Sequence, residues 1–202
     1  HALHALLSNV IYPSLSGTSV ARDFVEFPSK FMEHWIVAPA VLAGMGVPAD
    51  LIAAIGRAET YGQGFATVEF VASALIDLAL HRAPAVGVDP AAFTQAELKR
   101  LGIPVAIGMR HKLPYFTHVF DGGYASAYYS YLWSEVLDAD AYEAFVETGD
   151  IFDAATAYRF RDEILARGDS RDPMESFIAF RGRRPDETPL LRSRGLLDPT
   201  AP

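Results

Sequence analysis

The spacing of proline and glycine along the chain is the feature that most constrains its fold. These residues break the sequence into segments of helical length. Within the segments, apolar residues recur three or four positions apart, as Phe24, Phe27, Phe31 and Trp35 do. No segment shows the sustained alternation of apolar and polar residues that a half-buried strand requires. The chain is therefore predicted to be all-α.

The predicted helices and the loops between them follow from these proline and glycine positions. Helices are expected over His1–Leu7, Phe24–Trp35, Ala49–Ala58, Thr67–Arg82, Phe93–Leu101, Tyr124–Val146, Ile151–Ala166 and Asp172–Phe180. Loops are expected over Tyr12–Ala21 and Gly108–Gly123, and the polar tail Gly182–Pro202 is expected to wrap the surface. Asp23 and Asp172 are the predicted N-caps, and Pro28 falls near a first turn, where proline is tolerated.

Composition limits the classes of function that this chain can serve. Its 202 residues are 50% hydrophobic, which is enough for one large domain or part of one. A net charge of -8 argues against a nucleic-acid-binding surface. Because there is no cysteine, any metal must be held by His, Asp or Glu. The longest apolar stretch, Val68–Leu80, contains Glu69 and Asp77 and is predicted to be too short to span a bilayer, so a soluble protein without a membrane partner is expected.

One group of candidate metal ligands lies near the start of the chain. His1 and His4 are three residues apart on one predicted helical face, and Glu26 follows on a second helix after a loop. Two His residues and one carboxylate are a common ligand set for catalytic zinc, which leaves a fourth position for water. Taken alone, a pair of His residues at a chain start is more often a surface feature or a cloning remnant than a metal site.

A second group surrounds His118. The pair Gly122 and Gly123 follows it, and then Tyr124, Tyr128 and Tyr131 recur at i, i+4 and i+7. On one helix these tyrosines would present their hydroxyls along one face. An aromatic core stripe is the alternative interpretation, but burying three hydroxyls requires three hydrogen-bond partners, which Leu or Phe would not need. Phenols beside a His are suited to donate hydrogen bonds to a developing oxyanion.

Three long runs carry a resemblance to a known family. The runs Ser14–Trp35, Tyr115–Asp140 and Phe160–Glu175 closely resemble the dipeptidyl carboxypeptidase branch of the thimet-oligopeptidase-like zinc peptidases. The resemblance extends from His1 to about Leu197. It implies that residues 1–202 are the C-terminal part of a catalytic domain, a multi-helix subdomain of a larger two-lobed helical metallopeptidase.

The resemblance also implies a metal site that this sequence contains only in part. The family's motif reads H-E-F-G-H-A-L-H, and this chain opens with H-A-L-H. His1 would then be a ligand of one Zn²⁺, Glu26 in D-F-V-E-F-P-S would be another, and His4 has no assigned role. The first His ligand and the Glu that serves as general base are expected in the missing N-terminal part of the same chain, which the fragment would need as its partner.

The remaining site residues are assigned by the same resemblance. His118, Tyr124 and Tyr131 match positions that stabilise the transition state, and Tyr128 matches a substrate contact. Gly122 and Gly123 would form a mobile segment that lets His118 and Tyr124 close over a bound peptide. Arg22 is assigned to the positioning of substrate or of a helix.

Details of the sequence favour one branch of the family and mark departures from it. The runs R-D-F-V-E-F-P-S and Gly64–Phe70 (G-F-A-T-V-E-F) resemble the dipeptidyl type more than the oligopeptidase A type. Lys30 stands where the family usually has Gln, and Asp121 stands where a third Gly is common. The stretch Pro39–Pro48 is shorter than usual. The loop changes bear on the shape of the cleft, and none touches the metal ligands.

The implied activity is zinc-dependent hydrolysis of short peptides with release of C-terminal dipeptides. Two alternatives remain open from the sequence: an endo-acting oligopeptidase of the same family, and a non-catalytic helical remnant that serves as an interaction domain. With two of three ligands and no general base, the 202 residues alone are expected to bind zinc weakly and to be inactive. A cytoplasmic location is expected, with the periplasm as the alternative.

Overall fold

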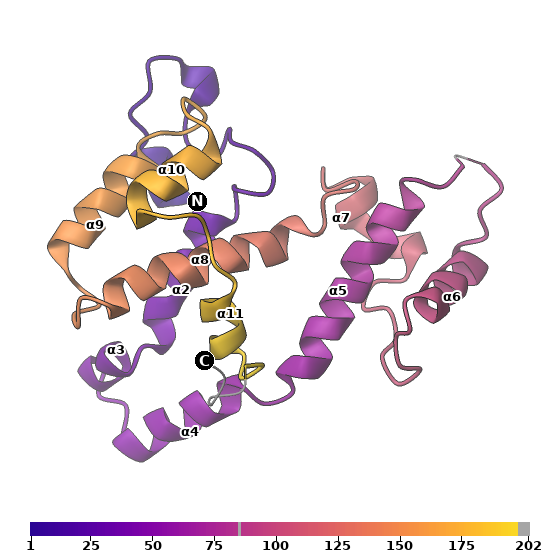
Figure 1. Ribbon diagram of the computed structural model, residues 1–202, viewed down its shortest axis with the longest axis horizontal. Coiled ribbons are helices and arrows are strands. Elements are labelled where there is room, and N and C mark those ends of the chain that lie inside the picture. The colour runs from indigo at the N-terminus through magenta and orange to yellow at the C-terminus, as the bar shows by residue number, and fades with distance from the viewer. Residues whose placement is uncertain (85, 198–202) are drawn as a thin grey trace. The chain divides into compact units, whose positions relative to one another are not determined.

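The computed structural model describes residues 1–84 and 86–197, and every described regular element is helical. Figure 1 traces the order of the helices along the chain. The prediction of an all-α chain is confirmed over these residues. The chain divides into two compact units: unit 1 comprises residues 1–61 and the segment from Tyr131 onward, and unit 2 comprises residues 62–130.

Unit 1 contains most of the helices. They are α1 (Ala2–Leu6), α2 (Phe27–Val37), α3 (Pro39–Gly44), α4 (Ala49–Glu59), α8 (Ser130–Val146), α9 (Ala154–Phe160), α10 (Pro173–Arg181) and α11 (Thr188–Ser193). A 3₁₀ turn covers Pro13–Leu15, and a π-helical turn, Arg161–Leu165, continues α9. The predicted single helix Ile151–Ala166 is therefore a shorter α-helix that widens in its last turn, where the Ala166 N–H bonds to the Arg161 carbonyl.

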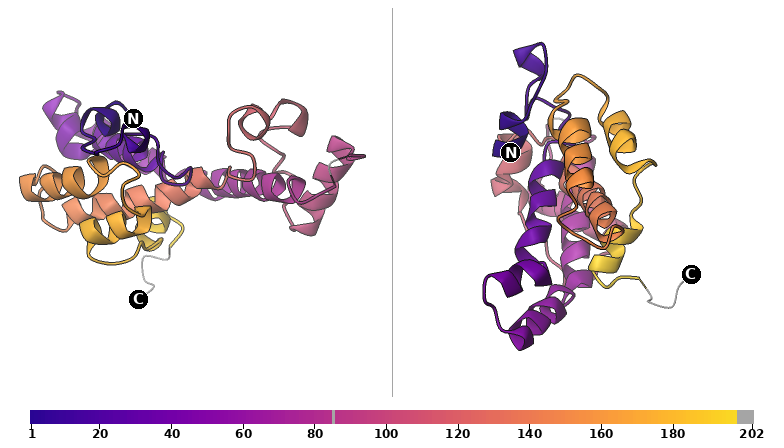
Figure 2. Two further views of the ribbon diagram at one scale, coloured as in Figure 1. Left: turned by 90° about the horizontal axis from the view of Figure 1, so that it is seen from above. Right: turned by 90° about the vertical axis from the view of Figure 1, so that its left-hand side faces the viewer.

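The core of unit 1 is built mainly from aromatic rings. Helix α2 supplies Phe27 and Phe31, which are 0% and 1% exposed, and Trp35 packs against this core while remaining partly exposed. Phe31 stacks on Phe160 of α9 with 4.0 Å between ring centroids, and Phe27 lies 6.0 Å from Phe177 of α10. Helices α2, α8, α9 and α10 thus meet around one cluster (Figures 1 and 2). The predicted apolar face of α2 is confirmed.

Helix α2 begins later than the sequence predicted. Its N-cap is Glu26 and its first residue is Phe27, so the predictions of a helix from Phe24 and of Asp23 as its cap were wrong. Residues 22–26 form turns instead. The reason is Pro28, which the later start places in the first turn, where its missing N–H costs nothing. In a helix from Phe24 the proline ring would clash with the Phe24 carbonyl.

The other helix ends in unit 1 agree more closely with the sequence. Asp172 caps α10 as predicted, since its Oδ1 accepts the N–H groups of Met174 and Glu175 at 2.8 and 3.2 Å. The tail contains a helix that the sequence did not predict, α11, and Leu190 of that helix is buried. Residues 198–202 of the predicted tail lie outside the described residues.

Unit 2 consists of α5 (Gln63–Leu80), α6 (Pro90–Arg100), a 3₁₀ turn (Leu113–Tyr115) and α7 (Thr117–Phe120). Helix α6 packs against α5 and against the 3₁₀ turn. The Asp89 carboxylate caps α6 by accepting the Ala92 N–H at 2.7 Å, so this helix begins three residues before the predicted Phe93. His118, predicted in a loop, lies in the short helix α7.

Helix α5 is longer than predicted. It has 18 residues with a mean hydropathy of 1.4, so by length and composition it could cross a membrane, and the prediction that the apolar stretch is too short for this was wrong. A single such helix is weak evidence, because core helices meet the same criterion. Its buried residues are Ala72, Ser73, Ala74, Ile76 and Asp77. The other residues of α5 are partly or fully exposed.

The largest correction to the predicted helices concerns the tyrosine segment. Helix α8 begins at Ser130, six residues after the predicted Tyr124, and residues 125–129 form turns. Ser126 has φ +58°, a left-handed conformation that interrupts any helix. Tyr124 and Tyr128 therefore do not share a helix face with Tyr131.

Candidate functional site

The two predicted metal ligands lie together in unit 1. His1 Nε2 is 3.1 Å from Glu26 Oε2, although 24 residues separate them in the sequence. His1 stands at the N-cap of α1, and Glu26 stands at the N-cap of α2. The His1 side chain is 48% exposed and that of Glu26 is 17% exposed. The pair is therefore open to solvent on the His side.

The geometry of this pair fits part of a zinc ligand set. Two ligands at adjacent corners of a tetrahedron with metal–ligand distances near 2.0–2.1 Å lie about 3.3 Å apart. The Ser29 hydroxyl donates to the Glu26 carbonyl at 2.9 Å and lies 3.3 Å from Glu26 Oε2, so the carboxylate is also held by its own helix. Among residues 1–84 and 86–197, no group of three or more His, Asp or Glu side chains converges. The described residues thus supply two donors.

His4 lies in α1 three residues after His1, and unlike His1 it is fully buried. It is 0% exposed, and neither ring nitrogen has a hydrogen-bond partner among the described residues. Burial, with the positive N-terminus as a smaller cause, lowers the His4 pKa from 6.5 to about 4. The imidazole is therefore neutral at pH 7, and among the described residues it joins no group of three metal-binding side chains.

The His118 cluster lies in unit 2 and is aromatic. The His118 ring is 6.1 Å from that of Tyr124 and 5.6 Å from that of Tyr128, between centroids. Tyr124 and Tyr128 are 7% and 5% exposed, and Tyr128 also stacks on Phe70 of α5 at 5.1 Å. The structure therefore brings together three of the predicted site residues.

The paired glycines form a tight turn beside His118. A Cβ on Gly122 would lie 2.9 Å from His118 Cα and 3.0 Å from its carbonyl oxygen, closer than real contacts allow. Gly123 has φ +75°, which glycine adopts without strain. The Tyr124 N–H then donates to the His118 carbonyl at 3.0 Å. The two glycines are thus needed to end α7 and to turn the chain toward Tyr124.

His111 is a member of this cluster that the sequence did not single out. Its Nε2 lies 3.3 Å from the Tyr128 hydroxyl, and its ring stacks on Phe116 with 4.8 Å between centroids. Burial lowers the His111 pKa, and the neighbouring charges of Arg110 and His118 lower it further. A neutral His111 can donate to or accept from the tyrosine hydroxyl. Proximity to His118 in the sequence was the only available signal.

The remaining predicted site residues lie in unit 1. Tyr131 is partly buried in the first turn of α8, and Arg22 is exposed in the turns before α2. The nine predicted residues are therefore divided between the units. His1, Glu26, Tyr131 and Arg22 belong to unit 1, and His118, Gly122, Gly123, Tyr124 and Tyr128 belong to unit 2.

Lys30, which stands where the family usually has Gln, forms ion pairs within unit 1. Its ammonium lies 3.7 Å from a Glu33 carboxylate oxygen and 3.5 Å from one of Glu135 on α8. A polar pocket of about 290 Å³ opens beside it, where His34 Nε2 lies 2.7 Å from Asp138 Oδ1. Burial raises the Asp138 pKa to about 6, although the bond to His34 opposes the rise. Lys30 thus joins α2 to α8.

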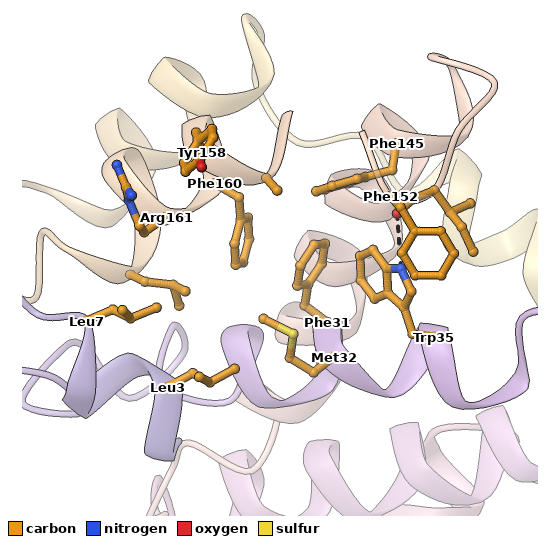
Figure 3. Close-up of a pocket in the computed structure, with 13 residues that line it drawn as sticks. Leu3, Leu7, Phe31, Met32, Trp35, Phe145, Phe152, Tyr158, Phe160 and Arg161 are labelled. Carbon is orange, nitrogen blue, oxygen red and sulfur yellow. Dashed lines mark hydrogen bonds between the residues drawn. The ribbon is translucent and has the colours of Figure 1, made fainter. Parts of the chain in front are cut away.

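A second pocket in unit 1 is almost wholly apolar (Figure 3). Its volume is about 400 Å³, and Leu3 of α1 and Leu7 just after it face Met32 and the aromatic rings of Phe31 and Phe160 across it. The Trp35 Nε1–H donates to the Ile151 carbonyl at its edge, at 3.0 Å. Among the described residues that line it, Arg161 is the one charged side chain, so these residues form no acid–base pair in the pocket.

Comparison with known proteins identifies the family. The model of Peptidase family M3 matches residues 1–196 of this chain. The dipeptidyl carboxypeptidases of Salmonella typhimurium and Escherichia coli are 39% and 36% identical over 97% of the chain. Oligopeptidase A of Escherichia coli is 38% identical over the same share. The chain belongs to Peptidase family M3. It spans about 30% of the length of these relatives.

Proposed function

We propose that the protein to which this chain belongs is a zinc-dependent peptidase that releases dipeptides from the C-termini of short peptides. The observation that carries the proposal is the approach of His1 Nε2 to Glu26 Oε2 at 3.1 Å in a chain of Peptidase family M3. A bound zinc ion would supply Lewis-acid polarisation of a water molecule and of the scissile carbonyl.

Residues of this chain have distinct roles in the proposed reaction. His1 and Glu26 would hold the metal, and Ser29 would fix the orientation of the Glu26 carboxylate. His118, Tyr124 and Tyr131 would donate hydrogen bonds to the oxyanion of the tetrahedral intermediate. Tyr128, whose hydroxyl is already close to His111, would contact the bound peptide.

A second activity, endo-acting cleavage of short peptides, is supported by a specific observation. Oligopeptidase A of Escherichia coli is 38% identical to this chain, between the 39% and 36% of the two dipeptidyl carboxypeptidases. The two activities differ in their need for a free substrate carboxylate. A pair of peptides identical except for amidation of the C-terminus separates them. The proposed activity requires cleavage of the free peptide with release of a dipeptide, and equal cleavage of both supports the endo-acting alternative.

Substitution of Glu26 tests the metal site in the full-length protein. Glu26→Gln keeps the side-chain shape but removes the charge, so zinc content and peptide hydrolysis should both fall by more than about 10-fold, since even outer-shell substitutions cost 10–100-fold. Glu33→Gln, on the same helix with a 64% exposed side chain, is the matched control and should retain both. Full zinc content in Glu26→Gln would refute the assignment.

A further inference from the structure

Asp77 is a buried carboxylate in unit 2 that no proposed step of the reaction uses. It lies in the second half of α5 and is 0% exposed, between Ile76 and a following run of leucine and alanine. A charged side chain in such surroundings is strongly destabilising unless it is fully paired. Its partners therefore indicate what it stabilises.

The partners of Asp77 are backbone groups of the tyrosine segment. The Ser126 N–H donates to Asp77 Oδ1 at 3.0 Å, and the Tyr128 N–H donates to Oδ2 at 2.9 Å. Each carboxylate oxygen thus holds one amide from a segment 49–51 residues away in the sequence. Hydrogen bonds from backbone N–H groups to a carboxylate are charge-assisted and stronger than neutral ones.

His81 completes the pairing of the carboxylate. It lies one turn after Asp77, and its Nδ1 is 2.8 Å from Asp77 Oδ1 and 2.9 Å from the Asp77 carbonyl oxygen. The His81 side chain is 27% exposed, so it closes the site on the solvent side. This contact fixes the direction of the carboxylate toward the tyrosine segment.

The segment that Asp77 holds has an unfavourable backbone conformation of its own. Among the described residues, Ser126 is the one non-glycine residue with a positive φ, at +58°. A serine adopts this conformation at a cost, and it persists only where surrounding contacts impose it. Without the two amide bonds to Asp77, Tyr124–Tyr129 has the periodicity to extend α8 toward its N-terminus.

We propose that Asp77 is a positioning residue that sets the conformation of residues 124–128 and thereby the placement of Tyr124 and Tyr128 beside His118. The role of Asp77 in turnover rests on the proposed function. The clamp, by which we mean the two hydrogen bonds from the Ser126 and Tyr128 N–H groups to the Asp77 carboxylate, rests only on the contacts above. Asp77 is fully buried, so it is not placed to contact a substrate directly. It acts through the backbone of the two tyrosines.

Variants of the full-length protein test the proposal with two readouts. Asp77→Asn keeps the shape but leaves one oxygen to accept two amides, so amide hydrogen exchange in residues 122–130 should accelerate at least about 10-fold. Because displacement of catalytic groups by about 1 Å costs about 10²-fold in rate, kcat should fall by about that factor. KM should change less than kcat.

Asp140→Asn is the matched control. Asp140 is also 0% exposed and accepts hydrogen bonds from Arg181, Arg183 and the Asp186 N–H, all in unit 1. Its substitution should lower the stability of unit 1, while kcat of the folded enzyme stays within about twofold and exchange in residues 122–130 is unchanged. If Asp77 had only a structural role, Asp77→Asn would lower the stability of unit 2 and likewise leave kcat of the folded enzyme within about twofold of wild type.

His81 provides a milder test if Asp77→Asn fails to fold. His81→Leu removes the Nδ1 donor at a partly exposed position and should give a smaller acceleration of exchange and a smaller fall in kcat. His81→Asn, whose amide nitrogen can take the place of Nδ1, should restore both. Failure of the Asn variant to restore them, with equal stability, would contradict the proposal.

The outcomes separate this proposal from the proposed function. Unchanged exchange in residues 122–130 of Asp77→Asn overturns the clamp, and faster exchange with unchanged kcat overturns the positioning role. An inactive wild-type protein would refute the peptidase assignment instead. In that case the exchange rates still decide whether Asp77 holds the tyrosine segment.

Discussion

His4 allows a quantitative prediction about pH and stability. The imidazole is fully buried, and neither ring nitrogen has a partner among the described residues. Its pKa in the folded chain is about 4, against 6.5 for an exposed His. Because the folded pKa is the lower one, protons bind preferentially to the unfolded chain. The contribution of His4 to stability is complete above pH 6.5 and is lost as pH falls toward 4.

The magnitude follows from the two pKa values. Each tenfold difference in proton affinity corresponds to about 1.4 kcal/mol, so the fall from 6.5 to about 4 corresponds to about 3 kcal/mol. The variant His4→Leu removes the titrating ring and fills a similar volume. It also removes two unpaired buried nitrogens, so at pH 7 it should be at least as stable as the wild type.

The assay is urea unfolding of the 202-residue chain at pH 7, 6, 5 and 4.5 in the presence of a chelator. The quantity compared is the difference in unfolding free energy between His4→Leu and wild type. In this difference the contributions of the other titrating groups to the pH dependence cancel. This difference should widen by about 2–3 kcal/mol between pH 7 and pH 4.5. A direct titration of the His4 ring by NMR should give a pKa well below 6.5.

Two results would refute this account. Parallel stability curves for wild type and His4→Leu would mean that the ring is solvated or paired in the folded chain. An NMR pKa near 6.5 would mean the same. Acetylation of the N-terminus removes the positive charge that is the smaller cause of the shift, so it should raise the His4 pKa slightly and leave most of the shift in place.

Two further substitutions test the core and the glycine turn. Phe31→Ala removes a ring that stacks on Phe160 and is 1% exposed. It should lower the unfolding free energy of unit 1 by about 3–5 kcal/mol, measured by urea denaturation. A loss below about 1 kcal/mol would show that the cluster is not a close-packed core. Gly122→Ala places a Cβ 2.9 Å from His118 Cα, so in the full-length protein it should reduce peptide turnover by about 10-fold or more without loss of zinc. Turnover equal to wild type would show that the turn shifts freely.

Much of the helical architecture of unit 1 could be predicted from local patterns. The recurrence of Phe27, Phe31 and Trp35 gave the buried face of α2, and Asp172 gave the start of α10. These features depend on residues within one or two turns of one another. Local sequence carries the information because helix periodicity and capping act over that range.

The segment around Tyr128 was not predictable in the same way. Its tyrosine spacing favours a helix, and the structure has turns instead, because two backbone amides bond to Asp77 about 50 residues earlier. The sequence carries one signal of this contact, because a carboxylate in the apolar second half of a helix needs partners. It did not reveal which groups those partners are.

The sequence by itself determined that the chain is helical, that it resembles a peptidase family, and that His1, Glu26 and the His118–Tyr131 segment are its candidate site. Only the tertiary structure decided that His1 and Glu26 are within 3.1 Å, that His4 is buried while His1 is exposed, and that Asp77 holds the tyrosine segment. The physical reason is the distance along the sequence over which the interactions act. Periodicity and motifs record local preferences, whereas the direction of a side chain at a site depends on contacts between segments that are distant in sequence.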